Sequence, residues 1–356
     1  MNRFNALDQV RGLAIAAMIL AHFGPAIWER IGLDGVVRDA VGMIGRFATP
    51  TFIAIFGITV AFAYLSKAAR NPAATRAKLV SRSGLVLVAA ILVASPEMVE
   101  TVLADERWGE SLPLALILDG YGVLSFYVFA ILVTALIIPY LSRNPYQAPL
   151  LLGSILIFFG TYLGYDSWSN SGQNGSELVR LYLVSGKYAL LVNYGIVLLL
   201  VSFGTFIRRE ITGGRDVNGI LMITGTSLAL LGLSLGRIVG WRTLSDLQLN
   251  YDAPPQVWYL FMVCGAMMIF LATLNRFSFP GLSFILEQIG RNPLAIYVAH
   301  AFVLPAHEVL EAAGLPENLS MIVPFVAFLC YCAFIILWKS RDLGKAGNAD
   351  PTLKAH

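Results

Sequence analysis

The sequence carries little charge for its length. Only 13% of its 356 residues are charged and 57% are hydrophobic, whereas soluble domains are about one-quarter charged. A water-soluble protein of this size could not bury that much apolar surface, but the hydrocarbon core of a membrane favours it. The net charge is only +3, and no basic cluster interleaved with aromatic residues occurs. The composition therefore predicts an integral membrane protein surrounded by lipids, and it argues against a nucleic-acid partner.

Cysteine and histidine are also scarce. The three cysteines, Cys264, Cys330 and Cys332, all lie inside apolar runs and do not form a CxxC or Cys/His metal-binding pattern. We interpret them as small buried apolar residues rather than disulfide partners. His300 and His307 are seven residues apart and share a helix face, but the sequence offers no third convergent ligand. The sequence therefore predicts no metal site.

Long apolar runs make up most of the chain. Runs long enough to cross a bilayer, about 20 residues each, occupy residues 10–28, 46–66, 79–96, 119–141, 148–165, 188–207, 219–239, 257–275, 292–313 and 320–338. Pro305 falls inside the ninth run, where we expect it to kink the helix rather than end it. These runs predict an all-α fold of about ten transmembrane helices. We expect one membrane domain over residues 1–340 and a polar cytoplasmic tail over residues 341–356.

The basic residues are distributed unevenly between the loops. With a cytoplasmic N-terminus, 17 of the 25 Lys and Arg residues lie on the inner side and 8 on the outer side. The acidic residues show the opposite distribution, with 6 inside and 16 outside. Because positive charge accumulates in cytoplasmic loops, both termini are predicted to be cytoplasmic, which requires an even number of spans.

A few ionisable side chains lie within or at the ends of the predicted spans. Such groups are costly in a membrane, and they mark either a functional site or a polar contact between helices. They are Asp8 and Arg11 at the inner end of the first span, His22 within that span, Arg46, Asp119 and Arg237 at the outer ends of spans two, four and seven, and His300 in span nine.

Both histidines within the spans could take part in proton transfer. At 1.5 Å per residue, His22 lies about 18 Å beyond Val10 and therefore past the middle of the bilayer. His300 lies about 12 Å beyond Asn292, nearer the middle. Histidine is the side chain whose ordinary pKa suits proton transfer near neutral pH. The alternative is that each histidine only makes a hydrogen bond between helices.

Other charged groups have simpler interpretations as well. Asp8 and Arg11 are three residues apart and could be a local ion pair at a helix end. His307 and Glu308 stand at the predicted outer interface, where a solvated loop face explains them.

Five stretches resemble the transmembrane acyltransferase superfamily, most of all its heparan-α-glucosaminide N-acetyltransferase-like branch, with the acyltransferase-3 proteins as more distant relatives. They occur in the family order and span most of the chain. They are Leu7 to Ala14 followed by His22, Phe47 to Gly57, Asp119 to Leu124, Tyr251 to Leu260, and Gly290 to His300. Two features depart from that branch. The loop at Pro254 and Pro255 lacks the usual Tyr-Pro-Pro-Ser order, and residues 24–45 contain no histidine.

The resemblance implies an enzyme that takes an acyl group, usually acetyl, from cytoplasmic acyl-CoA. It implies transfer to an amine or hydroxyl of a sugar or glycan on the other side of the membrane. His22 and His300 would then be the catalytic residues, either as general base or as the group that first accepts the acyl chain. A bacterial cytoplasmic membrane and a role in modifying the cell envelope are the expected setting.

The remaining charged residues would bind the two substrates. The inner-face arginines Arg11, Arg82 and Arg291 suit the CoA phosphates, with Asp8 orienting Arg11. At the outer ends of their spans, Arg46, Asp119 and Arg237 would contact the sugar. The competing hypothesis is a transporter or flippase for a small or lipid-linked solute, with the buried histidines as a proton relay.

Overall fold

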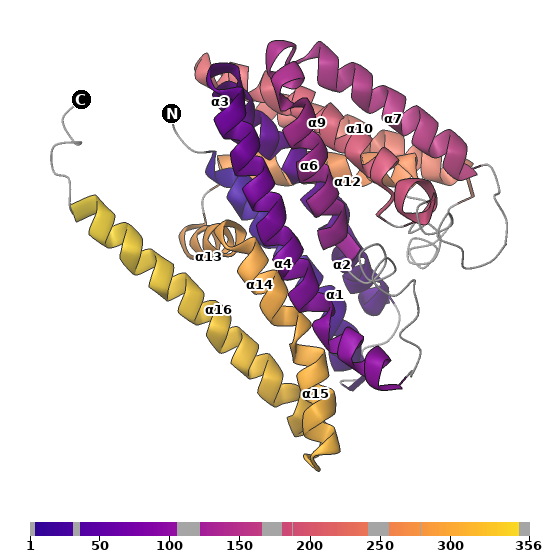
Figure 1. The fold of residues 1–356 in the computed structure, drawn as a ribbon, viewed down its shortest axis with the longest axis vertical. Helices are drawn as coiled ribbons and strands as arrows, with labels where there is room; N and C mark the ends of the chain where they lie inside the picture. The colour runs from indigo at the N-terminus through magenta and orange to yellow at the C-terminus, as the bar shows by residue number, and fades with distance from the viewer. Residues whose placement is uncertain are drawn as a thin grey trace.

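The computed structural model describes residues 4–30, 36–104, 122–165, 180–186, 188–240, 256–277 and 279–348 (Figure 1). Within these ranges the protein is entirely helical and contains no strand, which confirms the predicted all-α class. The helices are α1 (Asn5–Arg30), α2 (Val36–Val60), the π-helix η1 (Ala61–Leu65), α3 (Ser66–Arg70), α4 (Pro72–Ala104), α6 (Gly122–Arg143), α7 (Gln147–Tyr165), the π-helix η2 (Leu181–Ser185), α9 (Leu190–Thr212), α10 (Asn218–Ile238), α12 (Val257–Arg276), α13 (Pro280–Arg291), α14 (Pro293–Ala301), α15 (Val303–Ala312) and α16 (Glu317–Asn348).

The described helices account for all ten predicted apolar runs. Nine helical segments among these ranges are long and apolar enough to cross a membrane, and the apolar helix in α7 is shorter. A polytopic helical membrane protein is therefore confirmed. In Figure 1 the start of α1, the short α3 and the end of α16 lie on one side of the molecule, and α15 lies on the opposite side. Which side faces the cytoplasm stays a prediction.

The ninth predicted span is interrupted rather than only kinked. α14 ends at Ala301 and α15 begins at Val303, so Phe302 separates two helices that together form one candidate span, Pro293–Ala312. Pro305 explains the position of this break. Its ring excludes the α-helical hydrogen bond to residue 301 and crowds that carbonyl group.

The last helix extends past its predicted end. α16 continues to Asn348, into the segment that the sequence indicates is a polar tail from residue 341 onward. In Figure 1 it runs along one edge of the molecule and meets α15 near its first residues. The apolar segment of α16, Leu319–Trp338, is only 17% buried, which fits a helix that faces lipid.

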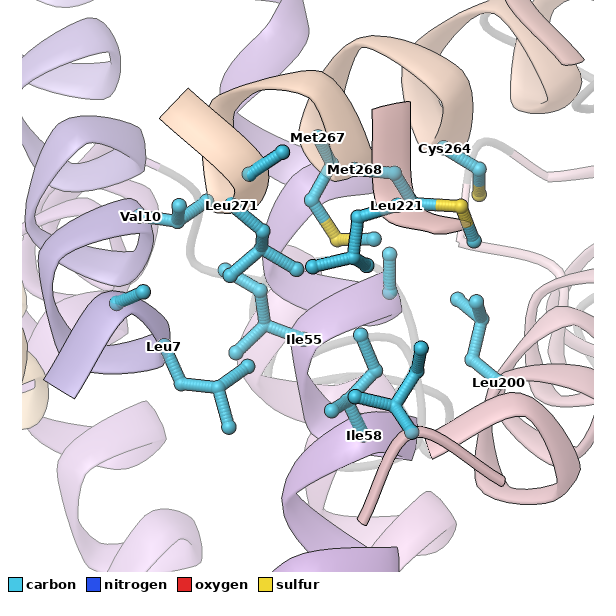
Figure 2. Close-up of a cluster of buried hydrophobic side chains, with 14 of the residues drawn as sticks. Leu7, Val10, Ile55, Ile58, Leu200, Leu221, Cys264, Met267, Met268 and Leu271 are labelled. Carbon is cyan, nitrogen blue, oxygen red and sulfur yellow. The ribbon is translucent and has the colours of Figure 1, made fainter. Parts of the chain in front are cut away.

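A large apolar cluster joins α1 and α2 to α9, α10 and α12 near the start of α1. Figure 2 shows Leu7 and Val10 of α1 together with Ile55, Ile58, Leu200, Leu221, Cys264, Met267, Met268 and Leu271. The helices α1, α2, α9 and α12 are covered by neighbours on more than one side. Their sequences therefore do not show one apolar face and one polar face. The cluster packs the first turns of α1 against α2.

One helix was not predicted from the sequence. α13 is a twelve-residue amphipathic helix between two spans, and it packs against α1. Its apolar content is too low and its length too short to register as a membrane span. The close approach depends on Gly12 and Gly290. A Cβ atom on Gly290 would lie 1.7 Å from the carbonyl oxygen of Asp8, and one on Gly12 would lie 2.0 Å from that of Leu286.

The second span changes its helical form near one end. After Val60 the backbone widens into the π-helix η1 before it returns to an α-helix at Ser66. Arg208 of α9 donates a hydrogen bond from Nη1 to the carbonyl oxygen of Ala61 and one from Nη2 to Oγ of Ser66, both at 3.0 Å. π-Helical turns are rare and frequently occur at functional sites. The π-helix begins two residues after Thr59, whose side chain binds Arg11.

Candidate functional site

Helix α1 places Arg11 and His22 on the same face. Eleven residues correspond to about three turns, and the two side chains therefore point in nearly the same direction about 16 Å apart along the helix. Between them on this face lie Ile15 and Met18, both of which are buried. The face is therefore covered by other helices, and it carries one polar group near each end.

Arg11 connects three helices at the N-terminal end of this face. Its Nη1 atom donates to Oδ1 of Asp8 at 2.9 Å and to the carbonyl oxygen of Gly290 on α13 at 3.1 Å. Its Nη2 atom donates to Oγ1 of Thr59 on α2 at 2.9 Å. The local Asp8–Arg11 ion pair predicted from sequence is present, but it belongs to a larger network. Thr59 was missed because nothing in its sequence surroundings distinguishes it from a core threonine.

Arg291 joins the same network from the end of α13. Its Nε atom lies 3.9 Å from Oδ2 of Asp8, and its guanidinium pairs with Glu287 one turn earlier. Asp8 is almost fully buried, with Arg11 and Arg291 on either side of its carboxylate. The structure thus brings together three of the four residues that the sequence analysis assigns to the acyl-CoA donor.

Arg82, the fourth predicted donor residue, is exposed on α4. Its assignment to the donor site stays a prediction. A dispersed set of arginines suits an extended polyanion better than a compact one.

His22 and His300 meet at the other end of the α1 face. Their ring centroids are 5.1 Å apart, and the rings are inclined by 75° in an edge-to-face arrangement. His300 is buried, whereas His22 is exposed. Phe23 also packs edge-on against His300, with centroids 6.5 Å apart. The two histidines that the sequence singles out are thus neighbours, and His22 is the more accessible of the two.

A backbone contact determines the tautomer of His300. Its Nδ1 atom forms a short hydrogen bond with the carbonyl oxygen of Tyr297. Because a carbonyl oxygen can only accept, Nδ1 must carry the proton. In neutral His300 the Nε2 atom is then unprotonated and can accept a hydrogen bond. A buried imidazole with one nitrogen fixed in this way is suited to orienting a neighbouring group.

The predicted acceptor-binding residues are dispersed. Arg46 is partly buried on α2, and its carbonyl oxygen accepts a hydrogen bond from the Tyr259 hydroxyl at 2.7 Å. Arg237 is exposed in the last turn of α10. Asp119 lies outside the described residues. The role of these three residues in binding the acceptor stays a prediction.

The side chain of His307 contacts residues of both α15 and α16. Its Nδ1 atom lies 2.9 Å from Oγ of Ser320 on α16, and its Nε2 atom lies 3.6 Å from a carboxylate oxygen of Glu311. The side chain therefore helps join α15 to α16, instead of belonging to a fully solvated loop face. No group of three or more potential metal ligands occurs among the residues that the structure describes.

Comparison with known proteins identifies a family. A family model for acyltransferase-3, described as an acyltransferase domain, matches residues 4–339 and thus nearly the whole chain. No curated protein matches the sequence. The match confirms the acyltransferase resemblance seen in the motifs. The finer resemblance to the heparan-α-glucosaminide N-acetyltransferase-like branch is not confirmed and stays a prediction.

Proposed function

The chain belongs to the acyltransferase-3 family of membrane acyltransferases, and on that premise we propose that it moves an acyl group from acyl-CoA to a sugar. The donor would bind from the cytoplasm, with acetyl-CoA the simplest candidate. The acceptor would be a hydroxyl or amine of a glycan on the other side of a bacterial cytoplasmic membrane. The chain would then modify the cell envelope.

The single observation that supports this proposal is the arrangement along α1. One helix face carries the Arg11 network at its inner end and the His22–His300 pair about three turns farther on. An acyl-CoA has a polyanionic nucleotide end and a thioester at the end of a long arm. The two polar groups on α1 match these two ends in order and in chemistry.

At the inner end, the donor's phosphates would pair with guanidinium groups. Arg11 and Arg291 are held in place by Asp8, and Arg82 lies on the nearby surface of α4. Arginine suits phosphate because its planar fork offers several donors in fixed directions. Asp8 would orient these side chains and take no part in bond making.

At the other end, His22 would act as the general base. It removes the proton from the acceptor hydroxyl or amine while the acceptor atom attacks the thioester carbon. The carbon–sulfur bond breaks, and CoA leaves as the thiolate, which takes up a proton. His300, protonated at Nδ1, would accept a hydrogen bond at Nε2 and so orient His22. An acyl-histidine intermediate on His22 is the alternative route.

A thioester assay tests the proposal against transport. Membranes containing the wild-type chain or the His22→Ala variant are supplied with acetyl-CoA and a cell-envelope glycan extract, and the released CoA thiol is measured. We expect acceptor-dependent thiol release by the wild type and a large loss in the variant. A folded wild-type protein that releases no thiol, but carries the glycan across the membrane, would contradict the acyltransferase and support the transporter.

A further inference from the structure

Tyr127 and Tyr297 differ from two other tyrosines of the membrane spans in their hydrogen bonding. The Tyr194 hydroxyl is hydrogen-bonded to Thr134 at 2.9 Å, and the Tyr259 hydroxyl donates to a carbonyl oxygen at 2.7 Å. By contrast, the hydroxyls of Tyr127 on α6 and Tyr297 on α14 make no hydrogen bond with another described residue. Both side chains are only partly buried. A partly accessible hydroxyl that makes no hydrogen bond within the protein can donate one to a ligand.

Tyr127 is connected by contacts to the Arg11 end of the site. Its ring packs edge-on against Phe56 of α2, with centroids 5.5 Å apart. Phe56 is three residues from Thr59 on the same helix face, and Thr59 accepts the hydrogen bond from Arg11.

Tyr297 is connected in the same way to the histidines. Its ring meets that of His300 edge-on, with centroids 4.9 Å apart, and its carbonyl oxygen fixes the His300 tautomer. It also packs against a cluster that includes Leu124, which lies three residues before Tyr127 on α6.

These contacts link Tyr127 to the Arg11 network and Tyr297 to the histidine pair, along the stretch that joins the two ends of the site. In the proposed function this is the path of the thioester. When the acceptor attacks, negative charge develops on the carbonyl oxygen of the thioester, and the enzyme must supply hydrogen-bond donors there. The histidines cannot serve, since His22 is required as a base and the only proton of neutral His300 is bound to a backbone carbonyl.

We propose that the hydroxyl groups of Tyr127 and Tyr297 donate hydrogen bonds to the carbonyl oxygen of the donor's thioester. They would stabilise the oxyanion while the acceptor's oxygen or nitrogen bonds to the carbon, and they would keep their own protons throughout. The carbon–sulfur bond then breaks, the carbonyl reforms, and CoA leaves as described above. This inference rests on the proposed function and adds two catalytic residues to it.

The test compares three isosteric variants in the same membranes. Tyr127→Phe and Tyr297→Phe each remove one hydroxyl from the proposed oxyanion site, and Tyr194→Phe removes one from a buried hydrogen bond with Thr134 as the matched control. The measurements are kcat with acetyl-CoA and the inhibition constant of free CoA, which has no thioester carbonyl. We expect each site variant to lower kcat about 10²-fold, the effect of losing one oxyanion donor, with CoA inhibition unchanged. We expect Tyr194→Phe to keep its kcat.

Three results would overturn the inference. One is wild-type kcat in both site variants. Another is weaker CoA binding in parallel with the lower kcat, since the hydroxyls would then act in donor binding. The third is an equal loss in Tyr194→Phe, which would indicate a general packing effect. If the wild type itself releases no thiol, the proposed function fails and the inference fails with it.

Discussion

The imidazole rings of His22 and His300 meet edge to face at 5.1 Å, although they come from opposite ends of the chain. Their environments differ in two respects. His300 is buried and bound through Nδ1 to the Tyr297 carbonyl, whereas His22 is exposed. The pair is thus asymmetric, with one ring held by the backbone and the other accessible to a substrate.

This asymmetry predicts unequal effects of replacing the two histidines. In His300→Ala the base remains but loses its orienting neighbour, and we expect turnover to fall less than in His22→Ala. Initial rates of CoA release at saturating donor would measure this. A His300→Ala variant that is inactive beside an active His22→Ala variant would exchange the two roles.

The orientation of the chain can be tested with cysteine reporters. In a background from which Cys264, Cys330 and Cys332 have been replaced, we expect Ala74→Cys to react from the cytoplasmic side and Gly172→Cys from the outer side. The reason is the excess of basic residues in the loops assigned to the interior. Labelling of both positions by one impermeant reagent from the same side would contradict the predicted topology.

The contact between α1 and α13 predicts a sharp difference between two glycines. A Cβ at Gly290 would lie 1.7 Å from the Asp8 carbonyl oxygen, whereas one at Gly281 of the same helix has no neighbour within 4 Å. Gly290→Ala must separate the helices, and we expect a loss of about 1–3 kcal/mol in stability, as for other overpacked sites. It should also raise the KM for acyl-CoA, because Asp8 and Arg291 move apart.

Gly281→Ala is the matched control, and thermal unfolding in detergent with donor kinetics is the measurement. Equal melting temperatures and equal KM values for the two variants would show that the close packing of α13 is not required.

The π-helix predicts that Arg208 and Arg209 are not equivalent. Arg208 donates to the Ala61 carbonyl and to Ser66, whereas the neighbouring Arg209 is exposed. Arg208→Met leaves that carbonyl without this donor, at a cost of about 1–3 kcal/mol, and we expect Arg209→Met to be close to neutral. Thermal unfolding of both variants checks this. Similar stabilities would mean that Arg208 does not support the π-helix.

Composition and local pattern were sufficient to predict the spans. A membrane helix must satisfy its own backbone and present apolar side chains to lipid, and both requirements are visible in the sequence. The same reasoning missed α13, whose amphipathic twelve residues depend on packing against α1. It also did not predict the break at Phe302, which depends on how the chain accommodates Pro305.

The site was predictable only in part. A charged or polar residue in a span is costly wherever it lies, so Arg11, His22 and His300 could be identified without a structure. Thr59, Tyr127 and the pairing of Arg291 with Glu287 could not, because their significance comes from contacts between helices far apart in the sequence. Arg46 and Arg237 meet the same sequence criterion, and their role in acceptor binding stays a prediction.

Donor binding is assigned to Arg11 and proton transfer to His22. This assignment is best tested by determining kcat and the acyl-CoA KM for Arg11→Ala and His22→Ala side by side. We expect Arg11→Ala to raise KM strongly, with Arg11→Lys recovering only part of the loss because an ammonium cannot replace the guanidinium fork. We expect His22→Ala to lower kcat about 10²-fold or more, the effect of a positioned general base, with KM unchanged. Wild-type donor affinity in Arg11→Ala, or nearly full turnover in His22→Ala, would contradict a donor site at Arg11 and a transfer site at His22.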